Sequence, residues 1–155
     1  MKKLALAAVG ALVLSGCALT TEVATQKEYA ASDGIRVDLD TVTLENLYLL
    51  SDGSPSDAVL SVVAVNNTDD DIDVTLEGEN ITWEASLSSK ETLNPATDET
   101  EPELLPGPFT PGENVQVTVR AGSESTTAAV PVLSACSAAY EDAYPGELNC
   151  PDRDE

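Results

Sequence analysis

The sequence predicts an all-β protein, an antiparallel β-sandwich of about seven strands and immunoglobulin-like type. Two observations support this fold class. Short runs of apolar or alternating apolar and polar residues recur from Gly34 onward, separated by turn-forming residues roughly every 8–12 positions. In addition, no segment carries the apolar repeat of an amphipathic helix. The predicted sandwich domain spans 34–133.

The predicted strands follow one another along this domain. They lie at 35–40, 42–50, 58–66, 72–78, 81–87, 114–122 and 126–133. In the strand 72–78, Ile72, Val74 and Leu76 alternate with polar residues and are expected to face the core. The run 58–66 is apolar on both faces, as a central strand can be. Pro131 favours an edge position for the last strand, because proline cannot donate to a sheet ladder.

Trp83 is expected to be the large core anchor, because it lies on the predicted inner face of 81–87 and the chain is only 4% aromatic. Ligand stacking is its alternative role. The stretch 88–114 is predicted to be a long loop with at most a short edge segment, since it holds five prolines. Its glutamates could form a partner-binding edge or a segment without fixed structure; they are Glu99, Glu101 and Glu103.

The first residues have the layout of a bacterial lipoprotein signal peptide. Lys2 and Lys3 precede an apolar run, 4–14, whose helix would be roughly 16 Å long, too short for a bilayer core of about 30 Å. "LSGC" at 14–17 then resembles the lipobox, which implies removal of 1–16 and acylation of Cys17. An ordinary signal peptide is the alternative. The segment 17–33 is small and polar, and we expect an acylated cysteine followed by a flexible tether.

The charge and the missing residue types restrict the function. Without 1–16 the chain keeps 139 residues, with 5 basic against 28 acidic side chains and a net charge of −23. Phosphate backbones repel such a chain, so nucleic-acid binding is excluded. The sequence contains no His and its one Met is Met1, which removes His-dependent catalytic triads and the soft ligands of Cu(I). Solubility explains the acidity more simply than binding of cationic partners does.

The cysteine count predicts one disulfide. If Cys17 carries lipid, Cys136 and Cys150 remain as an even pair in an oxidising compartment. Their bridge would close the loop "CSAAYEDAYPGELNC", a constraint of about 3 kcal/mol in the chain-entropy model. A reactive dithiol is the alternative, but neither CxxC spacing nor a basic neighbour supports it. The segment 134–155 is therefore expected to be a C-terminal segment stapled by this disulfide.

Several stretches together resemble a known group of proteins. The chain is similar to small actinobacterial lipoproteins, mostly uncharacterised, in the order of its segments. These are a lipobox and then "YAASDGIRV", "LENLYLLSDG", "AVLSVVAVNNTDDDIDVTLEG", "FTPGENVQVTV" and "AAVPV". The order is also similar to PCu(A)C-type copper chaperones, which implies a cupredoxin-like sandwich over 29–133. In those chaperones His and Met hold Cu(I) before a late Pro-Gly. The matching stretch here, "NPATDETEPELLPGPFTPG", has neither residue, so no copper ligand carries over.

The remaining site candidate is an acidic turn. Its aspartates offer the hard oxygen ligands that Ca²⁺ prefers, without the spacing of an EF-hand; they are Asp69, Asp70, Asp71 and Asp73. The prediction is a non-enzymatic binding or interaction module, held by lipid on the outer face of the bacterial cytoplasmic membrane. It has no expected cofactor, and its partner is an envelope protein or ligand of unknown identity. The alternatives are a Ca²⁺-binding protein and a carboxylate-dependent envelope hydrolase.

Overall fold

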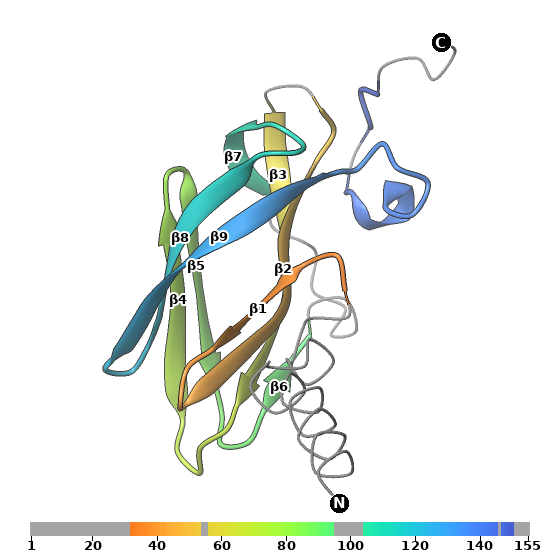
Figure 1. Cartoon of the computed structure of the whole chain (residues 1–155). Coiled ribbons are helices and arrows are strands. Elements are labelled where there is room, and N and C mark those ends of the chain that lie inside the picture. Colours follow the sequence, from red (N-terminus) through yellow and green to blue (C-terminus); the bar gives the residue numbers. More distant parts are fainter. Residues whose placement is uncertain (1–31, 54–55, 95–103, 146, 151–155) are drawn as a thin grey trace, which may run out of the picture.

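The structure is a computed structural model that describes residues 32–53, 56–94, 104–145 and 147–150 (Figure 1). It confirms the predicted all-β fold class. Among the described residues, no helix has the length and apolar character needed to cross a membrane. The strands are β1 (Ile35–Asp38), β2 (Val42–Ser51), β3 (Ser56–Asn66), β4 (Ile72–Gly78), β5 (Ile81–Leu87), β6 (Thr92–Leu93), β7 (Leu104–Phe109), β8 (Asn114–Ala121) and β9 (Glu124–Ser134).

The strands form one continuous path in the order β5-β4-β8-β9-β2-β3-β6, with β1 beside β2 and β7 beside β3. This path folds over on itself, so that β4, β5 and β8 pack against β1, β2 and β3 across a shared core (Figure 1). Strand β9 joins the two layers. It pairs antiparallel with β8 from Glu124 to Pro131 and then parallel with β2 from Val132 to Ser134.

The position of Pro131 corrects the expectation of an edge strand. Strand β9 is central, with β8 on one side and β2 on the other. Pro131 is the last residue of β9 that pairs with β8, opposite Asn114. The missing N–H therefore falls where the chain changes partners, and the ladder resumes at Val132, whose N–H donates to Glu113 O at 2.9 Å.

The core is aliphatic, which corrects the expected role of Trp83. Leu76, Ile81 and Leu87 are almost wholly buried, as alternation predicts, whereas Trp83 is only partly buried at the margin of the core. Trp83 lies on β5, the last strand of its layer, and packs against the core from its margin. The buried phenyl ring of the core belongs instead to Phe109.

The region 88–114, predicted to be a loop, contains two strands among its described residues. Strand β6 pairs with the end of β3, and β7 pairs with its beginning. Strand β7 accommodates Pro106 and Pro108 because, in the described part of the chain, β3 is the only strand it pairs with. Leu105 and Phe109 point inward and are buried, so this proline-rich segment contributes to the core.

Two segments of backbone approach each other closely at Gly34, directly before β1. Strand β2 is bulged between Glu45 and Tyr48, and Asn46 has a positive φ of 52°. The bulge brings the backbone against Gly34, where an added Cβ would lie 2.5 Å from Asn46 C. Only glycine fits there, because any side chain at this position would meet the β2 backbone.

Candidate functional site

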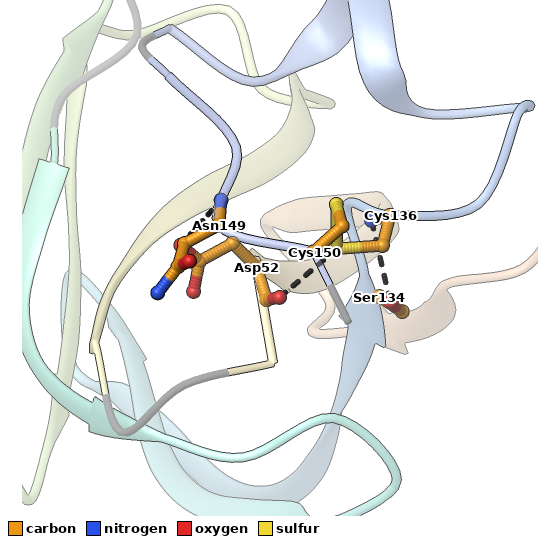
Figure 2. Close-up of a disulfide and its surroundings, with 5 residues drawn as sticks. All are labelled: Asp52, Ser134, Cys136, Asn149 and Cys150. Atoms are coloured by element: carbon orange, nitrogen blue, oxygen red, sulfur yellow. Dashed lines mark hydrogen bonds between the residues drawn. A yellow bond between two sulfur atoms is a disulfide. The ribbon is translucent and has the colours of Figure 1, made fainter. Parts of the chain in front are cut away.

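The C-terminal segment after β9 lies against the outer face of β2 and β3 (Figure 1). We call its described residues, 135–145 and 147–150, the strap. Within it Cys136 and Cys150 form the expected disulfide, with their Cα atoms 5.5 Å apart. Figure 2 shows how the bridge meets the body of the sandwich. Cys136 Sγ lies 3.0 Å from the backbone oxygen of Asp52, and Asn149 N–H donates to the Asp52 carboxylate at 3.3 Å.

A second, smaller apolar cluster lies beneath the strap. From the sandwich come Tyr48, Leu50 and Val59, which point outward from β2 and β3 and are at most 8% exposed. The strap and the end of β9 cover them with Leu133, Ala135, Tyr140, Tyr144 and Leu148. The rings of Tyr48 and Tyr140 are tilted at 54° with centroids 5.8 Å apart, a favourable aromatic contact. The cluster explains why the end of β2 and the start of β3, which lie beneath the strap, are apolar on both faces.

Two tyrosine hydroxyls tie the strap to segments far away in the sequence. Tyr140 donates to the carboxylate of Asp33, and Tyr144 donates to the backbone oxygen of Asp57 at 3.3 Å. Burial, together with the neighbouring Asp33, raises the pKa of the Tyr140 phenol to about 12. Sequence reasoning missed these residues. The available signal was the excess of apolar side chains on the outer faces of 42–50 and 58–66, which requires a covering segment.

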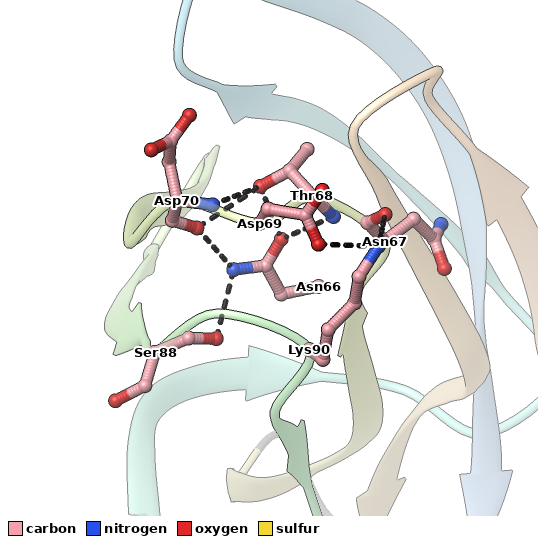
Figure 3. A network of polar contacts seen from close by, with 7 residues as sticks. All are labelled: Asn66, Asn67, Thr68, Asp69, Asp70, Ser88 and Lys90. Carbon is pink, nitrogen blue, oxygen red and sulfur yellow. Dashed lines mark hydrogen bonds and ion pairs between the residues drawn. The ribbon is translucent and has the colours of Figure 1, made fainter.

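The acidic turn between β3 and β4 is organised around one buried amide, that of Asn66 (Figure 3). Asn66 is 1% exposed. Its Nδ2 donates to the backbone oxygens of Asp70 and Ser88, each at 2.8 Å, and also to Leu87 O at 3.3 Å. Its Oδ1 accepts from Thr68 N at 2.9 Å and Thr68 Oγ1 at 2.7 Å. The amide thus joins the turn after β3 to the turn after β5.

The four aspartates of this turn do not converge on a common point. Asp69 pairs with Lys90 Nζ at 3.3 Å, whereas Asp71 accepts from the backbone N–H of Ser89 at 3.1 Å. Asp73 lies on β4 and accepts from the Ser86 hydroxyl on β5 at 2.5 Å. In the part of the chain that the structure describes, no group of three or more His, Cys, Asp or Glu side chains is arranged to hold a metal ion.

Other predicted site residues lie outside the described part of the chain. These are the proposed lipid-bearing Cys17 and the loop glutamates Glu99, Glu101 and Glu103. The structure therefore does not test the tether, the acylation or a partner-binding role for that loop.

The similarity of the chain to known proteins is distant. No protein-family model matches the chain, and no curated protein matches it. Among solved structures, the chain is similar to a copper-bound PCuAC domain from PmoF2. The two are 13% identical, and the match covers 64% of this chain and 97% of that chain with a TM-score of 0.46. At this level of similarity neither copper nor any ligand residue is transferred to this chain.

Proposed function

We propose that this protein is a lipoprotein of the bacterial cell envelope, anchored through Cys17, whose β-sandwich acts as a non-enzymatic binding module. The observation that carries the proposal is "LSGC" at 14–17, placed directly after a charged pair and a short apolar run. Two or three acyl chains on one residue satisfy the two-signal requirement for stable membrane anchoring. The anchor would have to act without electrostatic help, because the remaining chain is strongly acidic.

The non-enzymatic part of the proposal is supported by the composition of the chain. A sequence without His lacks the usual general base and the imidazole ligand of catalytic zinc sites. Carboxylates remain available, but a glycosidase-type mechanism needs a facing pair held about 5–10 Å apart. In the acidic turn each of these carboxylates is engaged by a different group, Asp69 by Lys90, Asp71 by Ser89 N–H and Asp73 by the Ser86 hydroxyl.

Acylation of Cys17 can be tested on the full chain in a bacterium that processes lipoproteins. Cells are fed an alkyne-tagged palmitate analogue, and the protein is examined by fluorescence after coupling to a dye. We expect label on the wild type and a lipidated N-terminal tryptic peptide that begins at Cys17 and ends at Lys27. Cys17→Ala should lose the label, whereas the matched control Cys136→Ala with Cys150→Ala should keep it. Label that persists in Cys17→Ala, or a mature chain that begins elsewhere, would refute the anchor.

The binding role can be tested through proximity labelling in intact membranes, with the labelling enzyme fused after Glu155. A binding module predicts a small set of envelope neighbours that is enriched over the set of an unrelated lipoprotein with the same fusion. Equal neighbour sets for the two proteins would argue against a specific partner.

A further inference from the structure

We propose that the strap is a redox-sensitive cover: reduction of Cys136–Cys150 releases it from the sandwich and exposes the apolar patch of Tyr48, Leu50 and Val59. The inference does not depend on acylation of Cys17. It rests on three features of the described residues, namely the position of the disulfide, the charges on both sides of the contact, and the separation of the patch from the main core.

The disulfide is placed so that it holds the far end of the strap. Cys136 comes two residues after the end of β9, and Cys150 is the last described residue of the strap. The bridge therefore returns the chain to the point where it left the sheet. Closing a loop of this length favours the docked state by about 100-fold in the chain-entropy model. Without the bridge, only the hydrogen bonds and apolar contacts of the strap itself would retain it.

Like charges oppose docking. The strap carries Glu141, Asp142 and Glu147, and the sequence from 135 to 150 contains neither Lys nor Arg. Two of its hydrogen bonds to the sandwich end on carboxylates, from Tyr140 to Asp33 and from Asn149 N–H to Asp52. Negative groups on both sides of one contact repel each other, and salt screens this repulsion. We expect the negative charge on both parts to weaken docking, and the covalent bridge would retain the strap against this repulsion.

The sandwich can keep its own core when the strap leaves. The patch beneath the strap belongs to a small cluster that is distinct from the main core between the layers. The strap contributes no strand, and its regular structure is a single 3-10 turn, Glu141–Ala143. Segments with few buried contacts open locally at lower free energy than the core. Release should therefore uncover Tyr48, Leu50 and Val59 while β4, β5 and β8 stay folded.

The reductant would be a dithiol. One of its thiolates attacks a sulfur of the bridge, which forms a mixed disulfide and frees one cysteine as a thiolate. The second thiol of the reductant, as thiolate, then attacks the mixed disulfide, frees the other cysteine and closes the reductant's own disulfide. Two electrons and two protons pass in all, which leaves Cys136 and Cys150 as thiols and the dithiol oxidised.

Hydrogen–deuterium exchange of the full chain in detergent, with and without dithiothreitol, tests the proposal. The oxidised strap should be protected at Tyr140, Ala143 and Asn149, whose N–H groups donate hydrogen bonds. We expect reduction to speed exchange there at least 10-fold and to leave β4 and β8 unchanged. Unchanged strap exchange would overturn the proposal, and so would a joint loss of protection in β4 and β8.

Two variants separate the covalent and the electrostatic contributions. Cys136→Ser with Cys150→Ser should exchange like the reduced wild type without any reductant. If this variant fails to fold, the bridge is a staple of the whole sandwich and the proposal is wrong. Glu141→Gln, Asp142→Asn and Glu147→Gln combined should slow strap exchange in the reduced chain relative to the reduced wild type. Equal exchange in these two reduced chains would refute the role of charge repulsion.

Discussion

The buried amide of Asn66 allows a quantitative test of how the acidic turn is held. Asn66→Ala removes four well-formed hydrogen bonds, two to backbone oxygens at 2.8 Å and two from Thr68 at 2.7 and 2.9 Å. Each such bond contributes about 1 kcal/mol net. In the variant, Thr68 and Asp70 can form hydrogen bonds with water instead. The Leu87 carbonyl oxygen is buried, so the hydrogen bond that it accepts from Asn66 is not replaced by water. We therefore expect a loss of about 2–4 kcal/mol in the free energy of unfolding.

The neighbouring Asn67 provides a matched control. It is exposed, and its Nδ2 donates to the Thr43 hydroxyl at 3.0 Å. Asn67→Ala should therefore cost no more than about 1 kcal/mol. Urea unfolding followed by far-UV circular dichroism measures both variants, and the slope with denaturant should not change. If Asn66→Ala destabilises the protein no more than Asn67→Ala does, the amide does not hold the two turns together.

Three further predictions concern the core, the acid range and metal binding. Leu76→Ala should cost about 2–5 kcal/mol in the free energy of unfolding, and Trp83→Ala should cost less, because Leu76 is fully buried and Trp83 is not. Thermal and urea unfolding measure both losses, and a larger loss for Trp83→Ala would contradict the reasoning. The Thr41 hydroxyl, with backbone N–H groups, lowers the pKa of Glu124 below its usual 4.5, so the contribution of Glu124 to stability is present above pH 4.5 and is lost as the pH falls through the folded-state pKa. Glu124→Gln should therefore be less stable than the wild type at pH 7. Unfolding measured across the acid range should show the difference in stability between the two proteins disappear. Millimolar Ca²⁺ should give neither calorimetric heat nor a shift of the unfolding temperature, and a shift that disappears in Asp71→Asn would restore the Ca²⁺-binding alternative.

Strict alternation made most of the fold predictable. Strand β4, with Ile72, Val74 and Leu76 inward, and strand β8, with Val117 and Val119 inward, lie where period-2 patterning places them. Such strands have one face on the core and one in water, so the sequence carries their orientation directly. The predicted seven strands are all present with small differences at their ends.

The sequence-based errors share a physical cause, because each depends on a strand's neighbours. Proline lowers strand propensity, but a strand paired on one side only tolerates Pro106 and Pro108. Trp83 lies on the expected face of β5, yet it is only partly covered, whereas Ile81 and Leu87 on the same face are buried. Local patterns report which face of a strand is apolar, but they do not report which strand lies beside it.

The candidate sites were predictable to different degrees. The Cys136–Cys150 disulfide is present as predicted from the even pair that remains if Cys17 carries lipid in an oxidising compartment. The contacts of the strap join residues 87 and 107 positions apart, such as Tyr144 with Asp57 and Tyr140 with Asp33, and no local pattern encodes pairs so distant. The aspartates were recognised as a cluster in sequence, but their side chains take separate partners because β4 and the preceding turn direct them differently.

A double perturbation connects the two regions and tests whether they form one cooperative unit. Asn66 pairs with Val42 at one end of the β2–β3 ladder, whereas Ser51, which accepts from Ala135 N–H of the strap, pairs with Ala58 at the other end. The two ends, at Val42 and Ser51, are nine positions apart along β2, which corresponds to about 30 Å. Perturbations this far apart without shared partners add within about 0.5 kcal/mol, so Asn66→Ala and disulfide reduction should have additive effects on urea unfolding. A coupling free energy well above that value would mean that the strap unfolds together with the sandwich. If the strap opens locally, the substitution of Asn66 at the far end should not change the free energy of that opening.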